Sequence, residues 1–342
     1  MKRIGFLSVF TVLILLLLCA CDGAPSSSPG TPAGSSPTGS PVEKLCYQNI
    51  SFSAHAEWAS PVVETDTHFY YIAADGIYEY TKATGTTNML LSETAYSLYL
   101  HGKDLYYRTE HEIKLVDLQT KSAAVIWDST MLPAGEDTDT LPYISIYDFA
   151  LQDGYLYIAG TGTSVIRICL ADHTAELFLI DCSQMVLRAN DCYYLDHAGR
   201  TFSLYHMTCD SQRTTLLRGE GISDPEKSRI DGIAGIDDTI AYSVRDDADI
   251  YLYRPNGEDE KIFDGNAETV WLTLINQWAG KELYFYTTDG AQLSLYEYQS
   301  ETGVKLLTSF ACTARICDIK VTESAVFWWS EEEAKVNCFV KE

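Results

Sequence analysis

Short apolar runs separated by polar turns recur along the whole chain. Between Ser97 and Asp128 there are four of them, at 97–100, 104–109, 113–118 and 122–127, each rich in Leu, Ile, Val, Tyr or Trp. Runs of this length and composition are typical of half-buried strands, and a sustained helical period of apolar residues is missing from the sequence. The pattern therefore predicts an all-β protein in which four short strands form one antiparallel sheet.

The second strand of this unit recurs seven times, 36 to 51 residues apart, with Tyr at the middle position of five copies. The third strand recurs as well, because Ile77-Tyr78-Glu79-Tyr80 before Thr84-Gly85 matches Leu295-Tyr296-Glu297-Tyr298 before Thr302-Gly303. A period of about 40–45 residues with four strands per unit predicts a β-propeller. The seven copies are Phe69–Tyr71, Leu105–Tyr107, Leu156–Ile158, Cys192–Tyr194, Ile240–Tyr242, Leu283–Phe285 and Val326–Trp328.

The last copy supplies only three predicted strands, at 316–320, 325–329 and 336–341, while Leu45–Ser53 reads as a lone strand before the first copy. We predict a seven-bladed propeller in which this N-terminal strand completes the last blade, with six or eight blades as the alternatives. Such closure removes open sheet edges. It would also bring Cys46 near Cys338, which makes a disulfide between them possible.

The repeat resembles the YWTD-like and quinoprotein-like propeller repeats, in which an aromatic strand precedes a third strand that ends in a Thr-Gly turn. It is most similar to the repeat propellers of uncharacterised function in bacterial lipoproteins, over roughly residues 45–342. This resemblance implies the fold and leaves the function open. It implies no cofactor, because the vicinal cysteine pair of quinoproteins is missing.

The N-terminus resembles a lipoprotein signal peptide. A basic start precedes the apolar run Phe6–Leu18, and Leu18-Cys19-Ala20-Cys21 is similar to a lipobox. The resemblance implies that residues 1–20 are removed and that Cys21 carries the lipid. Residues 21–42 are rich in Pro, Ser and Gly and read as a disordered tether before the propeller at 43–342. We therefore expect an extracytoplasmic protein, lipid-anchored to the bacterial cell membrane.

The charge and the cysteine content limit the classes of partner that the protein could bind. The formal net charge is −24, and removal of Lys2 and Arg3 makes the mature body more acidic. A body of this charge is a poor partner for nucleic acid, and it leaves cations, basic proteins and uncharged glycans open. Eight cysteines remain after Cys19 and Cys21 are set aside, so disulfides are permitted without being required. We expect a monomer.

In a propeller, the turns between the second and third strands and the connections between blades emerge on one face. Carboxylates in these loops could attract cations, including calcium, although a solvated acidic surface would look the same in sequence. The ligand-face candidates are Glu110, Glu136, Asp137, Asp139, Asp246, Asp247, Asp249 and Asp289.

Motifs for catalysis are missing: the sequence holds no H-E-x-x-H, no G-x-S-x-G and no P-loop. His111 and His197 lie in predicted loops of the ligand face and could be general bases. A histidine in such a loop is usually a solvent-exposed residue without a catalytic role. The favoured hypothesis is a non-catalytic binding or scaffold module for an envelope protein, peptide or glycan. The alternative is a glycan-processing lyase or hydrolase with carboxylates at the channel mouth.

Replacement of Cys21 tests the anchor. Cys21→Ser removes the thiol that would carry the diacylglycerol, so we expect the variant to be released from the membrane or to remain unprocessed. Metabolic labelling with a radioactive fatty acid measures this directly. Label that persists in the variant would show that the anchor is not at Cys21.

Overall fold

The chain divides into two compact units, Met1–Thr38 and Gly39–Glu342. The computed structural model describes parts of the second unit, and none of the described residues forms a helix that could cross a membrane. The described ranges are 61–73, 75–128, 146, 148–160, 164–196, 203–219, 230–236, 238–244, 248–256, 258–265, 271–275, 282–289, 291–311, 316–330 and 335–341.

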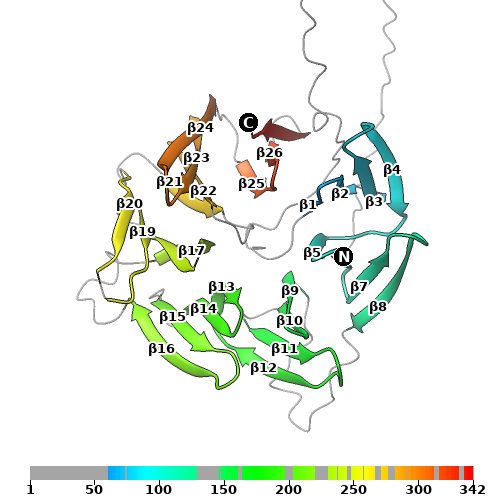
Figure 1. The fold of residues 1–342 in the computed structure, drawn as a ribbon, viewed down its shortest axis with the longest axis horizontal. Helices are drawn as coiled ribbons and strands as arrows, with labels where there is room; N and C mark the ends of the chain where they lie inside the picture. The colour runs from blue at the N-terminus through cyan, green and yellow to red at the C-terminus, as the bar shows by residue number, and fades with distance from the viewer. Residues whose placement is uncertain are drawn as a thin grey trace, which may run out of the picture. The chain divides into compact units, whose positions relative to one another are not determined.

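The described residues form antiparallel sheets that follow one another in chain order (Figure 1). Six of these sheets, or blades, have four strands and the seventh has three. The strands, blade by blade, are β1 (Val62–Glu64), β2 (His68–Ala73), β3 (Gly76–Thr81), β4 (Thr86–Leu91); β5 (Ser97–His101), β6 (Asp104–Arg108), β7 (Glu112–Asp117), β8 (Ser122–Asp128); β9 (Asp148–Gln152), β10 (Tyr155–Ala159), β11 (Val165–Cys169), β12 (Ala175–Leu179); β13 (Cys182–Arg188), β14 (Asp191–Asp196), β15 (Ser203–Thr208), β16 (Arg213–Arg218); β17 (Ile230–Ile236), β18 (Thr239–Val244), β19 (Asp249–Leu252), β20 (Glu260–Phe263); β21 (Trp271–Ile275), β22 (Glu282–Thr288), β23 (Gln292–Gln299), β24 (Gly303–Ala311); β25 (Ile316–Val321), β26 (Ala325–Ser330) and β27 (Lys335–Val340).

The predicted all-β propeller class is confirmed. The four strands predicted between Ser97 and Asp128 are β5 to β8, each within one residue of its expected bounds. Within the described part of the chain six blades are complete, so the predicted seventh complete blade is not confirmed. Its three C-terminal strands are present as β25, β26 and β27, and the proposed fourth strand, Leu45–Ser53, lies outside the described residues.

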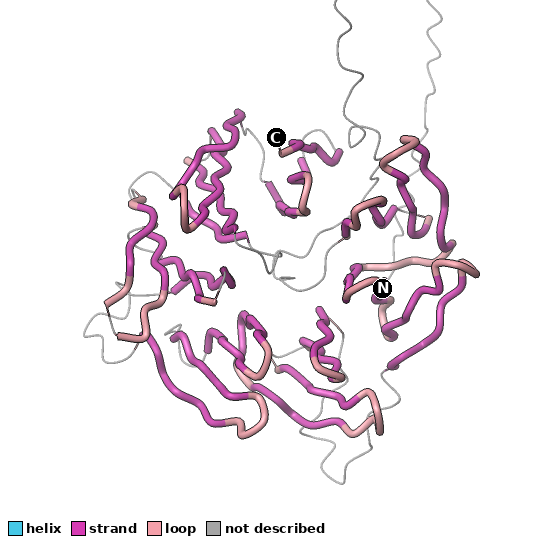
Figure 2. Tube along the Cα trace, in the orientation of Figure 1, coloured by secondary structure: helices cyan, strands magenta, loops and turns pink. Residues whose placement is uncertain are grey.

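Each blade buries both of its faces, and for this reason aromatic residues occupy adjacent positions in the second strand. In β6, Leu105 and Tyr107 pack into the core shared with the first blade, whereas Tyr106 packs into the core shared with the third. Neighbouring first strands contact one another, as in β1 with β5 and β17 with β21, so that successive blades lie face to face (Figure 2). A strand sandwiched in this way needs apolar side chains on both sides.

The same local packing arrangement recurs in the blades. In four of them, cross-strand partners on the second and third strands stack their rings, with centroids 5.1–5.5 Å apart and planes within 20°. The outer strand of every four-stranded blade has a β-bulge opposite this third-strand position, and the extra residue is apolar each time. A bulge of this kind turns the outer strand and increases its twist. The extra residues are Leu90, Ile126, Phe178, Leu217, Ile262 and Leu307.

The turn between the third and fourth strands also repeats, beyond what the sequence indicated. Gly85 and Gly303, the glycines of the two Thr-Gly pairs, have φ angles of 64° and 74°. Lys121, His173 and Gln212 hold the equivalent positions with φ angles of 50° to 60°, a region that side chains other than glycine seldom adopt. The same turn therefore forms in blades that lack the Thr-Gly signal.

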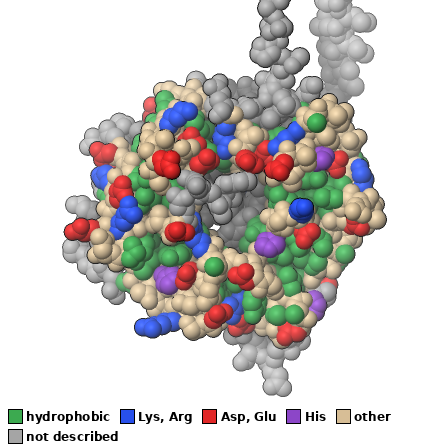
Figure 3. All heavy atoms as spheres, viewed as in Figure 1, with side chains coloured by type: hydrophobic (Ala, Val, Ile, Leu, Met, Phe, Trp, Pro, Cys, Tyr) green, Lys and Arg blue, Asp and Glu red, His purple; other side chains and the backbone are tan. Residues whose placement is uncertain are grey.

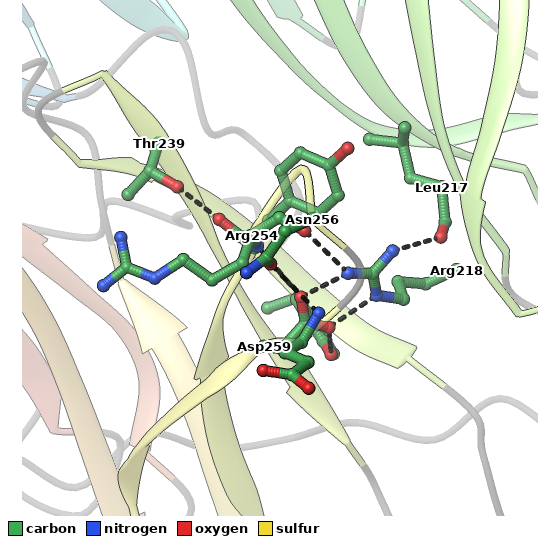
Figure 4. Close-up of polar contacts among 9 residues, drawn as sticks. Leu217, Arg218, Thr239, Arg254, Asn256 and Asp259 are labelled. Carbon is green, nitrogen blue, oxygen red and sulfur yellow. Dashed lines mark hydrogen bonds and ion pairs between the residues drawn. The ribbon is translucent and has the colours of Figure 1, made fainter.

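These turns reach the neighbouring blade. Arg218, at the end of β16, pairs with the carboxylate of Asp259 in the turn before β20 and donates to the carbonyl oxygen of Arg254 at 3.1 Å (Figure 4). The hydroxyl of Tyr242 also donates to Asp259. In the same way Arg167 of β11 donates to the carbonyl oxygen of Cys209 at 2.9 Å, so charged side chains join the rims of consecutive blades.

The seventh blade contacts both of its neighbours through buried charge. Glu64, at the end of β1, is 5% exposed and forms an ion pair with Lys82. Its carboxylate accepts hydrogen bonds from the backbone nitrogen of Ser324 at 2.9 Å and from the Ser324 hydroxyl at 2.6 Å. The rings of Phe69 and Phe327 meet edge to face at 6.0 Å. The first and last blades are therefore in direct contact.

On its other side the seventh blade contacts the sixth. Lys341 donates to the hydroxyl of Tyr284 at 2.8 Å, and that hydroxyl lies 2.7 Å from Glu282 and 3.0 Å from Glu297. The ammonium group also lies 4.6 Å from the centre of the Tyr284 ring. Figure 3 shows acidic and basic side chains side by side where the seventh blade meets its neighbours.

Glu64→Gln tests the contact between the first and last blades. Burial would raise the pKa of Glu64, but hydrogen bonds from Lys82 and from Ser324 outweigh it and hold the pKa below the ordinary 4.5. The carboxylate therefore stabilises the fold above about pH 4.5, and this contribution disappears as the pH falls through the lowered folded-state pKa. At pH 7 we expect the free energy of unfolding of the variant to be about 2 kcal/mol lower than that of the wild type, because the Glu64 carboxylate that pairs with Lys82 is gone.

Urea unfolding of both proteins between pH 3 and pH 7 measures this difference, which should shrink as the solution becomes acidic. Glu260→Gln is the control, because Glu260 pairs with Arg254 at the exposed rim and should contribute less than about 1 kcal/mol. If the Glu64→Gln variant were as stable as Glu260→Gln at pH 7, the inference that Glu64 stabilises the contact between the first and last blades would be wrong.

Candidate functional site

Three of the ligand-face candidates lie in described residues, and they differ in what their carboxylates contact. Glu110 is in the turn between β6 and β7, with a side chain that is 72% exposed. Asp289 is exposed but accepts the backbone nitrogens of Ala291 at 2.8 Å and Gln292 at 2.7 Å, which lowers its pKa. Glu136, Asp137, Asp139, Asp246 and Asp247 lie outside the described residues, as does His197.

Asp249 is not a surface ligand. It is 2% exposed, forms an ion pair with Lys261, and accepts the backbone nitrogen of Gly265 at 2.9 Å and the Tyr251 hydroxyl at 3.1 Å. Burial would raise its pKa, but these contacts outweigh burial and lower it. The structure therefore corrects the expectation that Asp249 belongs to an exposed acidic loop, and the described residues include no group of three acidic, histidine or cysteine side chains that could hold a metal.

The cysteine predictions are not tested. Cys169, Cys192 and Cys209 are free thiols. Cys21 and Cys46 lie outside the described residues, and Cys338 is described only through its backbone pairing with Phe327. The described cysteines therefore neither support nor oppose a Cys46–Cys338 disulfide.

A mixed polar cluster lies at one end of the second blade, where β6 turns into β7 and where the chain enters β5. Ser97 pairs with Arg108 and Glu112 pairs with Asp128, so these four residues mark the same end of the sheet. The turn is closed by hydrogen bonds between Thr109 and Glu112, at 2.9 and 3.1 Å. We call the cluster the blade 2 platform; it consists of Glu93, Tyr96, Tyr107, Arg108, Glu112 and Lys114.

Tyr96 is the exposed centre of the blade 2 platform. It is 47% exposed, and it is the one exposed Phe, Tyr or Trp among the residues whose exposure is described. Its backbone nitrogen donates to the carbonyl oxygen of Arg108 at 2.8 Å, which extends the β5–β6 ladder by one bond. The Arg108 guanidinium lies 5.0 Å from the ring centre. The ring is thus held in place on one side while much of it remains open to solvent.

The carboxylate of Glu93, in the same connection into β5, is fixed by two donors. Lys114 donates to one oxygen and the hydroxyl of Tyr107 donates to the other, both at 2.5 Å. Lys114 also pairs with Glu112 at 2.9 Å. Partial burial would raise the pKa of Glu93, but Lys114 and Tyr107 outweigh it and lower the pKa. Burial and the nearby Glu93 carboxylate raise the pKa of Tyr107, so its phenol stays protonated as a donor.

Arg108 links the platform to the third blade. Its guanidinium donates to the carbonyl oxygen of Ile146, just before β9, and to the Ser97 hydroxyl at 3.4 Å. Burial lowers the pKa of Arg108, against the opposing effect of the buried Asp148 carboxylate. The guanidinium is therefore occupied by the protein itself, and its role is to position Tyr96.

Seven described carboxyl groups have a lowered pKa. In Glu64, Glu93, Asp249 and Asp259 the pKa is lowered because hydrogen-bond donors and cations outweigh burial. A carboxylic acid that protonates a glycosidic oxygen needs a raised pKa. The remaining cases, Asp117, Asp172 and Asp289, accept hydrogen bonds within their own turns.

The fold matches those of solved β-propellers at low sequence identity. Virginiamycin B lyase from Staphylococcus aureus aligns with a TM-score of 0.56 over 87% of this chain and 98% of that one, at 13% identity. A streptogramin B lyase gives 0.54 over 85% and 96%, at 12% identity. PorZ, a surface component of the type-IX secretion system of Porphyromonas gingivalis, gives 0.51 over 85% of this chain and 38% of that one, at 14% identity.

These likenesses show the fold alone. No protein-family model matches the chain, and no curated protein sequence matches it.

Proposed function

We propose that this protein is a lipid-anchored, extracytoplasmic β-propeller that binds an envelope protein, peptide or glycan without catalysing a reaction. The observation that carries the proposal is the blade 2 platform. An exposed tyrosine ring held by Arg108 has the composition of a binding hot spot, in which Tyr and Arg are enriched, and the same connection into β5 carries the ordered carboxylate of Glu93. Ordering before binding also reduces the entropy cost of association.

The proposed location rests on the N-terminal sequence, in which Cys21 would carry the lipid and residues 21–42 would tether the propeller. PorZ offers a precedent for a bacterial surface protein with this fold. The alternative of a glycan-processing enzyme gains no support from Glu64, Glu93, Asp249 and Asp259, whose pKa values are lowered.

Completion of the seventh blade by Leu45–Ser53 belongs to the same proposal. The three-stranded sheet β25–β26–β27 stands beside six sheets with four strands.

Deletion of residues 43–53 tests this closure. We expect the melting temperature to fall by about 10 °C, because the loss of one strand removes several kcal/mol from a protein of this size. Removal of residues 25–35 from the tether is the matched control and should leave the melting temperature unchanged. A Cys46–Cys338 disulfide would add roughly 4–5 kcal/mol in the chain-entropy model, and non-reducing peptide mapping would detect it. Equal melting temperatures for the two deletions would refute the closure.

Capture from solubilised cell envelopes tests the binding role. We expect the immobilised full chain to retain a defined envelope component that purified material then binds in titration, and we expect Tyr96→Ala to weaken that binding at least tenfold. Ile180→Ala is the control, because Ile180 is 63% exposed in the third blade, outside the platform. Repeating the titration with calcium and with a chelator measures any contribution of Glu136, Asp137 and Asp139. Equal retention by the wild type and both variants would contradict the proposal.

A further inference from the structure

We draw no further inference here: the strongest candidate, the exposed apolar side chains that recur on the outer strands β4, β8, β12 and β24, carries none because nothing in the structure shows what covers them.

Discussion

The structure depends on the burial of both faces of every blade. A strand that is covered on both sides has apolar residues at successive positions, and a row of such sheets is stable only when the first and last also cover each other. The contact of Glu64 with Lys82 and Ser324 meets this requirement, since it joins residues 260 positions apart in the chain. Burying a carboxylate here is tolerable because two hydrogen bonds from Ser324 and a cation satisfy it.

The blade 2 platform is a consequence of the same architecture. The connection that leads into β5 and the turn from β6 to β7 emerge at one end of the second blade, so residues distant in sequence meet there. Tyr107 illustrates the link between core and surface: its ring is buried against the first blade, while its hydroxyl holds Glu93 at the platform. The rigid packing of the blade thus orders the surface carboxylate.

Repeating features were readable from the sequence, and features that depend on contacts between blades were not. The second-strand column correctly placed the blades because its aromatic residues are needed in each of them. The bulges also left a signal that could have been used, since runs such as Met89-Leu90-Leu91 and Leu177-Phe178-Leu179 break the alternation expected of an outer strand. Glu64 gave no such signal, because its partner Ser324 lies at the other end of the chain.

The same limit applies to the site. Acidic loops were recognised from composition, but composition cannot show that Asp249 is buried and neutralised by Lys261 while the Glu110 side chain is 72% exposed. Tyr96 was missed because the chain has 23 tyrosines, and the other tyrosines that the structure describes pack in or against the buried clusters. Its distinction is its exposure, which only the packing of the second blade reveals.

Site-specific photo-crosslinking in living cells tests the central claim most directly, that a partner docks on Tyr96. A benzophenone amino acid placed at position 96 should form an adduct with one envelope protein. The same group at position 180 should form no such adduct. Absence of an adduct at position 96, or the same adducts at both positions, would contradict the assignment of the platform as the binding site.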